Sequence, residues 1–164
     1  MSQHCFVALG ANLGNPVATV KEAIISLRGL PQTRFISASS LYRTAPLGLK
    51  NQPDFINAVV ELVTALSAPE LLESLFSIEA DFGRQRSVKY APRTLDLDLL
   101  LHGDAVSDDP LLTLPHPRMH ERAFVLAPLL EIAPQLAIPG RGSVGELFLR
   151  CAGQTIEKLL PQAA

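Results

Sequence analysis

Apolar and polar residues recur at two different spacings along this chain. Apolar residues three to four positions apart predict one helix between Asn15 and Gly29 and a second between Ser67 and Gly83. Alternation of apolar and polar positions predicts strands at residues 4–10, 34–42, 54–64 and 95–102. The resulting order, βαββαβ, predicts an α+β fold with a ferredoxin-like core, in which an antiparallel sheet carries helices on one face and an active site on the other.

Short signals define where these helices begin. Pro16 directly follows the capping residue Asn15, and Ser67 with Glu70 forms a capping box. Beyond residue 102 we expect a proline-rich connection and then a C-terminal helical extension. Its elements are a helix within residues 123–132, a short helix near residues 144–150 and a short strand near residues 155–159. We expect residues 1–164 to form a single domain, because no linker interrupts the pattern.

Asp96 and Asp98 alternate with leucines in the last of these predicted strands. Because side chains alternate along a strand, the two carboxylates lie on one face about 6.6 Å apart, and the leucines point into a core. Two oxygen ligands on a rigid strand suit Mg²⁺ bound with substrate phosphates, whereas a solvated strand face is the alternative. A run of cations precedes the pair: Arg84, Arg86, Lys89 and Arg93. Acids for a metal beside arginines for phosphate oxygens are typical of phosphoryl transfer.

The strand predicted at residues 54–64 also has two chemically different faces. Alternation places Phe55 and Asn57 on the side opposite the core. Irregular segments at residues 43–53 and 84–92 flank this side, because both are rich in turn-forming or charged residues. They are either lids that close over a ligand or ordinary connections.

Composition limits the classes of function. The formal net charge is −2, and only 18% of residues are charged, which argues against a general nucleic-acid binder or a membrane-surface binder. No apolar run approaches the roughly 20 residues that span a bilayer, and the N-terminal residues lack the pattern of a secretory signal. We therefore expect a cytoplasmic protein.

The spacing of cysteines and histidines disfavours a zinc site. Cys5 and Cys151 are far apart in the sequence and are interpreted as small core residues. His116 and His120 are four positions apart, but no third histidine or cysteine is near. With Arg118 and Arg122 alongside, contact with phosphate is favoured over zinc.

Several short motifs resemble those of one enzyme family. They are Ala8-Leu9-Gly10-Ala11-Asn12-Leu13-Gly14, Tyr42-Arg43-Thr44, Gln52-Pro53-Asp54-Phe55-Ile56-Asn57-Ala58, Gly83-Arg84-Gln85-Arg86, Pro92-Arg93-Thr94-Leu95-Asp96-Leu97-Asp98, Leu114-Pro115-His116-Pro117-Arg118-Met119 and Arg122-Ala123-Phe124-Val125-Leu126. From about residue 4 to Pro134 the chain resembles the 6-hydroxymethyl-7,8-dihydropterin pyrophosphokinase family of folate biosynthesis. The resemblance implies transfer of the β,γ-pyrophosphoryl unit of ATP to the pterin hydroxymethyl group, with release of AMP and with two Mg²⁺ ions held by Asp96 and Asp98.

The same resemblance assigns residues to the two small-molecule substrates. The pterin would lie between the rings of Phe55 and Phe124, and its edge would be read by Asn57 and by the backbone at Thr44, Ala45 and Leu47. ATP would be held by Glu79, Arg86, Arg93, His116 and Arg122, with Leu99, Leu112 and Thr113 around the adenine. The positions matching catalytic residues are Arg84, Arg86, Arg93 and Asp98. Nothing in the resemblance implies nucleic acid or membrane as a partner, and we expect a monomer.

Two of these assignments leave alternatives open. Asp98 is the candidate base if the reaction uses one, but a metal can lower the pKa of the attacking hydroxyl enough to make a base unnecessary. Glu79 is either an exposed helix acid or a partner for an arginine of the following segment. Three positions depart from what is common in the family: Phe55 replaces a tyrosine, Tyr90 a tryptophan and Pro117 an aromatic residue.

Two other classes of function compete with this interpretation. A non-catalytic ferredoxin-like module that binds a ligand or RNA would more often carry basic and aromatic residues along the sheet than two acids. A two-metal phosphohydrolase would usually need more metal ligands than the two aspartates. The product formed from ATP distinguishes these classes.

Overall fold

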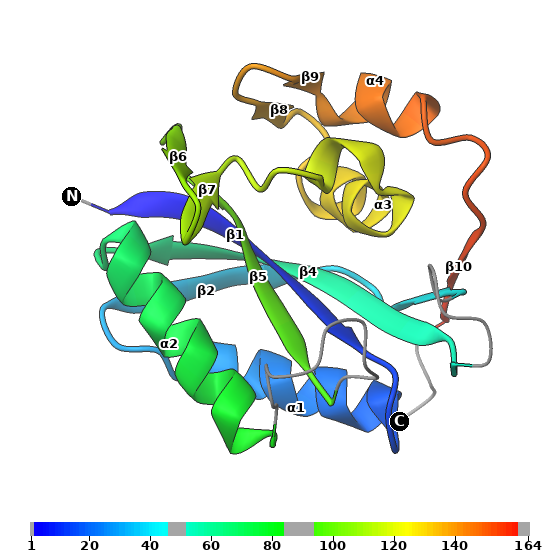
Figure 1. Ribbon diagram of the computed structural model, residues 1–164, viewed down its shortest axis with the longest axis horizontal. Coiled ribbons are helices and arrows are strands. Elements are labelled where there is room, and N and C mark those ends of the chain that lie inside the picture. Colours follow the sequence, from blue (N-terminus) through cyan, green and yellow to red (C-terminus); the bar gives the residue numbers. More distant parts are fainter. Residues whose placement is uncertain (1, 46–51, 84–93, 161–164) are drawn as a thin grey trace.

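Six strands form one antiparallel sheet in the computed structural model, which describes residues 2–45, 52–83 and 94–160 (Figure 1). The strand order is β10-β3-β4-β1-β5, and β2 also pairs with β4. The strands are β1 (Gln3–Ala11), β2 (Thr33–Ala38), β3 (Tyr42–Thr44), β4 (Phe55–Thr64), β5 (Asp96–His102) and β10 (Ile156–Lys158). Strand β5, which carries the two aspartates, therefore lies at one edge of the described sheet.

Helices α1 (Pro16–Arg28) and α2 (Ala68–Asp81) cover one face of the sheet, as predicted (Figure 1). The Asn15 side chain accepts a hydrogen bond from the Ala18 N–H at 3.2 Å, and Ser67 and Glu70 form the expected reciprocal capping box. Between these helices and the sheet lies a core of buried aliphatic side chains, among them Leu27, Leu62, Leu71, Leu75 and Leu97. Both helix predictions are thus confirmed, together with their starting signals.

The opposite face of the sheet is not free along its whole length. Helices α3 (Ala123–Ile132) and α4 (Val144–Leu149) lie over it, and they bury Phe6, Val59 and Leu101 in a second core (Figure 1). The two helices between the predicted strands lie on one face as expected, but the other face is not left free, because the C-terminal helices cover part of it. These three apolar side chains point away from the first core, and their burial needs a second layer. Space for a site remains near the first residues of β4 and β5.

The strand predicted at residues 34–42 is divided into β2 and β3, and both pair with β4. Ser39 lies at the break, where its hydroxyl accepts a hydrogen bond from the Val59 N–H at 3.0 Å and donates one to the Ser40 carbonyl at 2.8 Å. A side chain thus replaces part of the backbone pairing. Because β3 continues to Thr44, the start of the segment predicted to be irregular is regular strand.

A β-bulge alters the alternation of β5 near its end. Leu99 pairs with Val7, and Leu101 pairs with Phe6, so Leu100 is an extra residue on β5. Leu99 consequently belongs to the first core and Leu101 to the second. A bulge of this kind re-aims side chains beside it, and Leu100 lines the cavity described below.

Several short elements after β5 were not predicted. They are the hairpin of β6 (Ser107–Asp109) and β7 (Leu112–Leu114), the 3₁₀ turn η1 (Met119–Glu121), and the hairpin of β8 (Ala137–Ile138) and β9 (Gly142–Ser143). The predicted final strand corresponds to β10, which pairs with β3. Among the described residues, no helix has the length and apolar character needed to cross a membrane.

Candidate active site

Three neighbouring strands align an aspartate, a glycine and an asparagine. Gly10 on β1 is the register partner of Asp96 on β5 and also of Asn57 on β4. Two residues earlier on β1, Ala8 lies between Asp98 and Val59 in the same way. Since adjacent strands are about 4.8 Å apart, Asp96 and Asn57 are separated by about 10 Å at the backbone. The small side chains between them leave open space above the sheet.

A cavity of about 460 Å³ lies over this part of the sheet. Its walls come from β1, β3, β4 and β5, from the segment before η1 and from the start of α3. It brings together nine of the predicted site residues: Thr44, Ala45, Phe55, Asn57, Asp96, Asp98, His116, Arg122 and Phe124. A mixed polar and aromatic cavity of this size is suited to a small-molecule ligand.

Asp96 and Asp98 lie partly exposed on the cavity side of β5, whereas Leu95, Leu97 and Leu99 are buried in the first core. The predicted alternation is therefore confirmed at these five positions. In the described parts of the chain, no cluster of three or more His, Cys, Asp or Glu residues could enclose a metal ion. Two carboxylates fit Mg²⁺ that shares its remaining positions between water and phosphate oxygens, and they do not fit an all-protein cage.

His116 and Arg122 add a hydrogen-bond donor and a positive charge beside Asp98. The pKa of His116 is lowered from its usual value. Burial is the largest cause and the charge of Arg122 adds to it, while the charge of Asp98 acts in the opposite direction. The imidazole is therefore neutral near pH 7. Its Nδ1 accepts a hydrogen bond from the Arg118 N–H at 3.3 Å, which places the imidazole proton on Nε2. Burial also lowers the pKa of Arg122, against the effect of Asp98, but a guanidinium stays charged at neutral pH. Both groups can donate to phosphate oxygens.

The other end of the cavity has amide and aromatic character. The buried Asn57 donates a hydrogen bond from Nδ2 to the Thr44 hydroxyl oxygen at 2.9 Å. Phe55 and Phe124 are half-buried, and the Arg122 guanidinium carbon lies 5.5 Å from the centre of the Phe124 ring. Half-buried rings near a fixed amide can stack on a flat heterocycle and distinguish its edge.

Glu79 occupies a different environment from the one expected of an exposed helix acid. Its side chain is 1% exposed, and Oε2 accepts a hydrogen bond from the Leu97 N–H at 2.7 Å. The Leu97 N–H points away from β1, and β5 is the edge strand of the described sheet. The Glu79 carboxylate on α2 therefore accepts the hydrogen bond that a neighbouring strand would otherwise accept. The interpretation as an exposed acid is wrong, and the contact of Glu79 with ATP stays a prediction.

The residues predicted to surround the adenine line a second hollow of about 230 Å³. Leu99, Leu112 and Thr113 contribute to it, between β5, β7 and α2. Asp98 and His116 line both this hollow and the larger cavity. The two spaces therefore meet at the pair of residues that would face the phosphates.

Four predicted site residues lie outside the described residues: Leu47, Arg84, Arg86 and Arg93. The structure adds lining residues to which the sequence assigned no role, namely Ala8, Gly10, Gln52 and Leu100, and it places Arg118, expected beside His116, in the same lining. Ala8 and Gly10 had a usable signal, because small residues alternate with Val7 and Leu9 on one predicted strand. Gln52 belongs to one of the quoted motifs, but the pattern did not indicate that it reaches the cavity, because its position depends on how a connection folds back on the sheet.

Sequence comparison points to one family. Residues 6–134 match the family model for 7,8-dihydro-6-hydroxymethylpterin-pyrophosphokinase (HPPK). A Pseudomonas aeruginosa protein named 2-amino-4-hydroxy-6-hydroxymethyldihydropteridine pyrophosphokinase is 43% identical over 159 residues, which cover 97% of this chain and 98% of that protein. The Haemophilus influenzae protein of the same name is 41% identical over 156 residues, or 95% of this chain and 98% of that protein.

Structural comparison supports the same architecture. A crystal structure of Plasmodium falciparum HPPK-DHPS A437G with STZ-DHP gives a TM-score of 0.73 at 12% identity, over 92% of this chain and 45% of that chain. At so low an identity the similarity supports the fold alone, and this chain spans less than half of the crystallised one. The two sequence matches support membership of the family as well as the fold, since each extends over nearly all of this chain and of the matched protein at more than 40% identity. The chain belongs to the 7,8-dihydro-6-hydroxymethylpterin-pyrophosphokinase family.

Proposed function

We propose that this protein transfers pyrophosphate from ATP to 6-hydroxymethyl-7,8-dihydropterin in folate biosynthesis, giving the pterin diphosphate and AMP. One observation carries the proposal: a single cavity has Asp96 and Asp98 in one part of its wall and Phe55, Asn57 and Phe124 in another. Joining a flat heterocycle to a nucleotide phosphate requires both substrates in one space, with the hydroxyl oxygen held against the β-phosphorus.

The pterin occupies the aromatic end of the cavity in this proposal. Phe55 and Phe124 stack on its two faces, and Asn57 together with the backbone at Thr44, Ala45 and Leu47 binds its edge. The proposal is supported by the hydrogen bond from Asn57 to Thr44, which fixes the amide before a ligand arrives. A fixed amide loses little rotamer entropy on binding and is selective for one pattern of donors and acceptors.

ATP occupies the shared part of the cavity and the second hollow. We assign the adenine to the hollow lined by Leu99, Leu112 and Thr113, and the phosphates to His116 and Arg122. Arg86, Arg93 and Glu79 complete the ATP-binding set, and Arg84, Arg86 and Arg93 supply catalytic charge. Arg84, Arg86 and Arg93 lie outside the described residues, and their assignment rests on the sequence motifs.

Asp96 and Asp98 are proposed to hold two Mg²⁺ ions. When bound, such ions neutralise phosphate charge and lower the pKa of a nearby hydroxyl. The protein contributes two carboxylates whose spacing is set by β5 and whose strand is held by Glu79 through the Leu97 N–H. Asp98 would accept the proton of the pterin hydroxyl if a side chain acts as base.

At the level of the chain, we propose a ferredoxin-like core with a C-terminal helical extension, in one domain of residues 1–164. The sheet order β3-β4-β1-β5, with α1 and α2 on one face, is consistent with that topology. We further propose a cytoplasmic monomer whose partners are its two small substrates, without nucleic acid or membrane. The net charge of −2 supports this choice of partners.

One incubation tests the proposed function. The protein is mixed with MgATP and 6-hydroxymethyl-7,8-dihydropterin, and nucleotides are separated chromatographically. We expect AMP and the pterin diphosphate in equal amounts, and no AMP without the pterin or with excess chelator. Appearance of ADP would indicate transfer of one phosphate only, and free phosphate without the pterin would indicate a hydrolase. Either product in place of AMP contradicts the proposal.

A further inference from the structure

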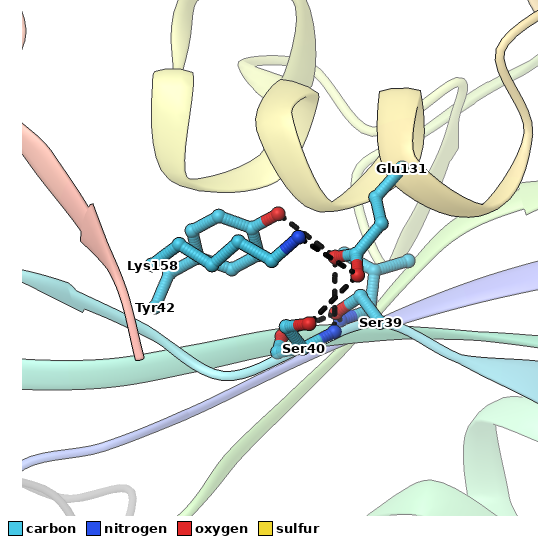
Figure 2. Close-up of polar contacts among 6 residues, drawn as sticks. Ser39, Ser40, Tyr42, Glu131 and Lys158 are labelled. Carbon is cyan, nitrogen blue, oxygen red and sulfur yellow. Dashed lines mark hydrogen bonds and ion pairs between the residues drawn. The ribbon is translucent and has the colours of Figure 1, made fainter. Parts of the chain in front are cut away.

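Glu131, near the end of α3, connects this helix to two strands at the far edge of the sheet (Figure 2). Its carboxylate accepts hydrogen bonds from the Ser40 N–H at 2.9 Å, the Ser40 hydroxyl at 2.7 Å and the Tyr42 hydroxyl at 2.8 Å. The Lys158 ammonium on β10 lies 3.5 Å from the same carboxylate. We call Glu131, Ser40, Tyr42 and Lys158 the Glu131 clamp. None of its members lines the cavity.

The clamp joins the two elements that form opposite walls of the cavity. Phe124 precedes Glu131 on α3 by seven residues, which is about two helical turns, so both side chains leave the same side of the helix. Tyr42 precedes Thr44 by two residues on β3, so these side chains share one face of the strand. Each wall therefore carries one clamp residue and one cavity residue on the same side.

Strand β3 is short, and the clamp adds a contact with α3 to its strand pairing. It has three residues and pairs with β4 and with the equally short β10. Two of its three pairing partners on β4, Asn57 and Phe55, are cavity residues. A shift of β3 relative to α3 would therefore change the distance between Phe124 and the Thr44–Asn57 hydrogen bond.

The clamp holds through an ionised carboxylate. Burial opposes ionisation of Glu131, but the hydrogen bonds from Ser40 and Tyr42 and the charge of Lys158 outweigh it and lower its pKa. Burial, assisted by the Glu131 charge, raises the pKa of Tyr42, so its hydroxyl remains a donor at neutral pH. Hydrogen bonds to a carboxylate are stronger than those between neutral groups.

We propose that Glu131 is a positioning residue for the pterin site, and that the clamp sets the separation between Phe124 on α3 and the Thr44–Asn57 pair on the sheet. This inference rests on the proposed function. The affinity of a flat ligand between two walls depends on their spacing to a fraction of an ångström, because dispersion contacts weaken quickly with a gap. The adenine hollow lies between β5, β7 and α2, and Arg122, assigned to the phosphates, lies at the start of α3, so the affinity for ATP should depend on the clamp less than the affinity for the pterin does.

Calorimetric titration tests the proposal without relying on turnover. The variants are Glu131→Ala, Glu131→Gln and Tyr42→Phe, and the probes are 6-hydroxymethylpterin and the magnesium complex of a non-hydrolysable methylene analogue of ATP. We expect the pterin Kd to rise about three- to tenfold in Glu131→Ala and less in the other two variants, with the Kd of the ATP analogue changed less than about twofold.

A matched control comes from the other side of the same two strands. Glu157 on β10 faces Arg43 on β3 in an exposed ion pair with 3.7 Å between the charged groups. Glu157→Gln removes one carboxylate from this strand pair without touching the clamp, and it should leave both dissociation constants unchanged. A purely structural role for Glu131 would lower the unfolding temperature without a selective change in the pterin Kd.

The outcomes separate the clamp from the function on which it rests. Unchanged pterin affinity in folded Glu131→Ala, or equal weakening of both ligands, overturns the positioning role. If Glu131→Ala does not fold, Tyr42→Phe and Glu131→Gln are judged by the same criterion, because they remove one hydrogen bond or one charge. If the parent protein binds the ATP analogue but not the pterin, the proposed function fails, and the clamp proposal with it.

Discussion

Asp96, Asp98 and Asn57 give the cavity its chemistry, and backbone pairing fixes each of them in place. Gly10 pairs with Asp96 on one side and with Asn57 on the other, and it has no side chain to fill the space above the strand. A larger residue there would occupy the region between the carboxylate and the amide. Asp96, Gly10 and Asn57 therefore form one row across three strands, and we expect substitutions at each position to affect a different property of the site.

Replacing either aspartate removes a proposed metal ligand without disturbing the leucines beneath it. We expect Asp96→Asn and Asp98→Asn to lower kcat by about a thousandfold or more, since loss of transition-state charge stabilisation by a single group has effects of this order. The unfolding temperature and the pterin Kd should stay close to those of the parent. Asp104→Asn, at an exposed position beyond β5, is the control. Near-normal activity of either site variant with Mg²⁺ would show that the metal assignment is wrong.

Asn57 is predicted to determine which heterocycle binds. Asn57→Ala leaves groups at the pterin edge without partners, which should weaken pterin binding by about 1–3 kcal/mol with little effect on the ATP analogue measured alone. Phe55→Tyr restores the residue common in the family and should change both affinities very little. Calorimetry with each ligand checks both expectations. An Asn57→Ala protein that binds the pterin as tightly as the parent would contradict this placement of the pterin.

Gly10 lies so close to Asn57 that even a methyl side chain at position 10 would crowd the amide. A Cβ atom at position 10 would lie 3.2 Å from Asn57 Oδ1, so Gly10→Ala must push the amide aside by a few tenths of an ångström. We expect a pterin Kd raised about tenfold, in line with a displaced buried hydrogen-bonding group, and a smaller effect on stability. Gly29→Ala, whose added Cβ would meet Ser26 O at 3.6 Å, is the control. Equal pterin affinity in both variants would refute this role.

At the scale of secondary structure, the alternation of apolar and polar residues predicts which face of a strand is buried more reliably than it predicts whether the strand is unbroken. The strand with Asp96 and Asp98 shows its expected faces because leucines at every second position demand burial. The predicted strand at residues 34–42 is broken because the Ser39 hydroxyl competes for the backbone of β4. The bulge at Leu100 could not be predicted either, since leucine is compatible with either buried face of the strand.

Helix α2 and strand β5 depend on each other through Glu79. Glu79→Ala leaves the Leu97 N–H without its acceptor, which should lower the free energy of unfolding by about 1–3 kcal/mol. Glu73→Ala, at an exposed position on the same helix, should change it by less than about 0.5 kcal/mol. Urea unfolding followed by circular dichroism measures both values. Similar stability of the two variants would mean that water satisfies the Leu97 N–H.

For the whole molecule, the sequence predicts one helical layer well and the second incompletely. The first core forms from the consecutive βαββαβ elements whose apolar faces the pattern predicts, whereas the second needs residues 123–151 to fold back over β1, β4 and β5. Sequence patterns reveal the helices α3 and α4 but not the surface on which they dock. The same difference applies to the cavity residues. The positions of Asp96, Phe55 and Asn57 could be predicted from the alternation of their strands. Phe124 and Arg122 reach the cavity because α3 docks on the sheet, which the alternation does not predict.

The two cores contain one cysteine each, which allows their opening to be compared in a single experiment. Burial raises the pKa of Cys5 to about 12, against the effect of a backbone hydrogen bond from Gly103, and burial also raises that of Cys151. Both thiols are therefore protonated at pH 8 and should react with iodoacetamide only after local or global opening. Cys5 lies in the first core on β1, which pairs with a strand on each side, whereas Cys151 follows the short helix α4 in the second core.

We expect Cys151 to be labelled at least about ten times faster than Cys5 in the folded protein, because a six-residue helix at the periphery opens at lower free energy than the centre of the sheet. Adding urea should accelerate Cys5 more steeply, since its exposure requires unfolding of more surface. Mass spectrometry of peptides from samples quenched at successive times gives both rates, and Cys5→Ser and Cys151→Ser variants verify each assignment. Equal rates with equal urea dependence would show instead that both layers unfold as one cooperative unit, so that the docked layer carrying Phe124 is as stable as the sheet beneath it.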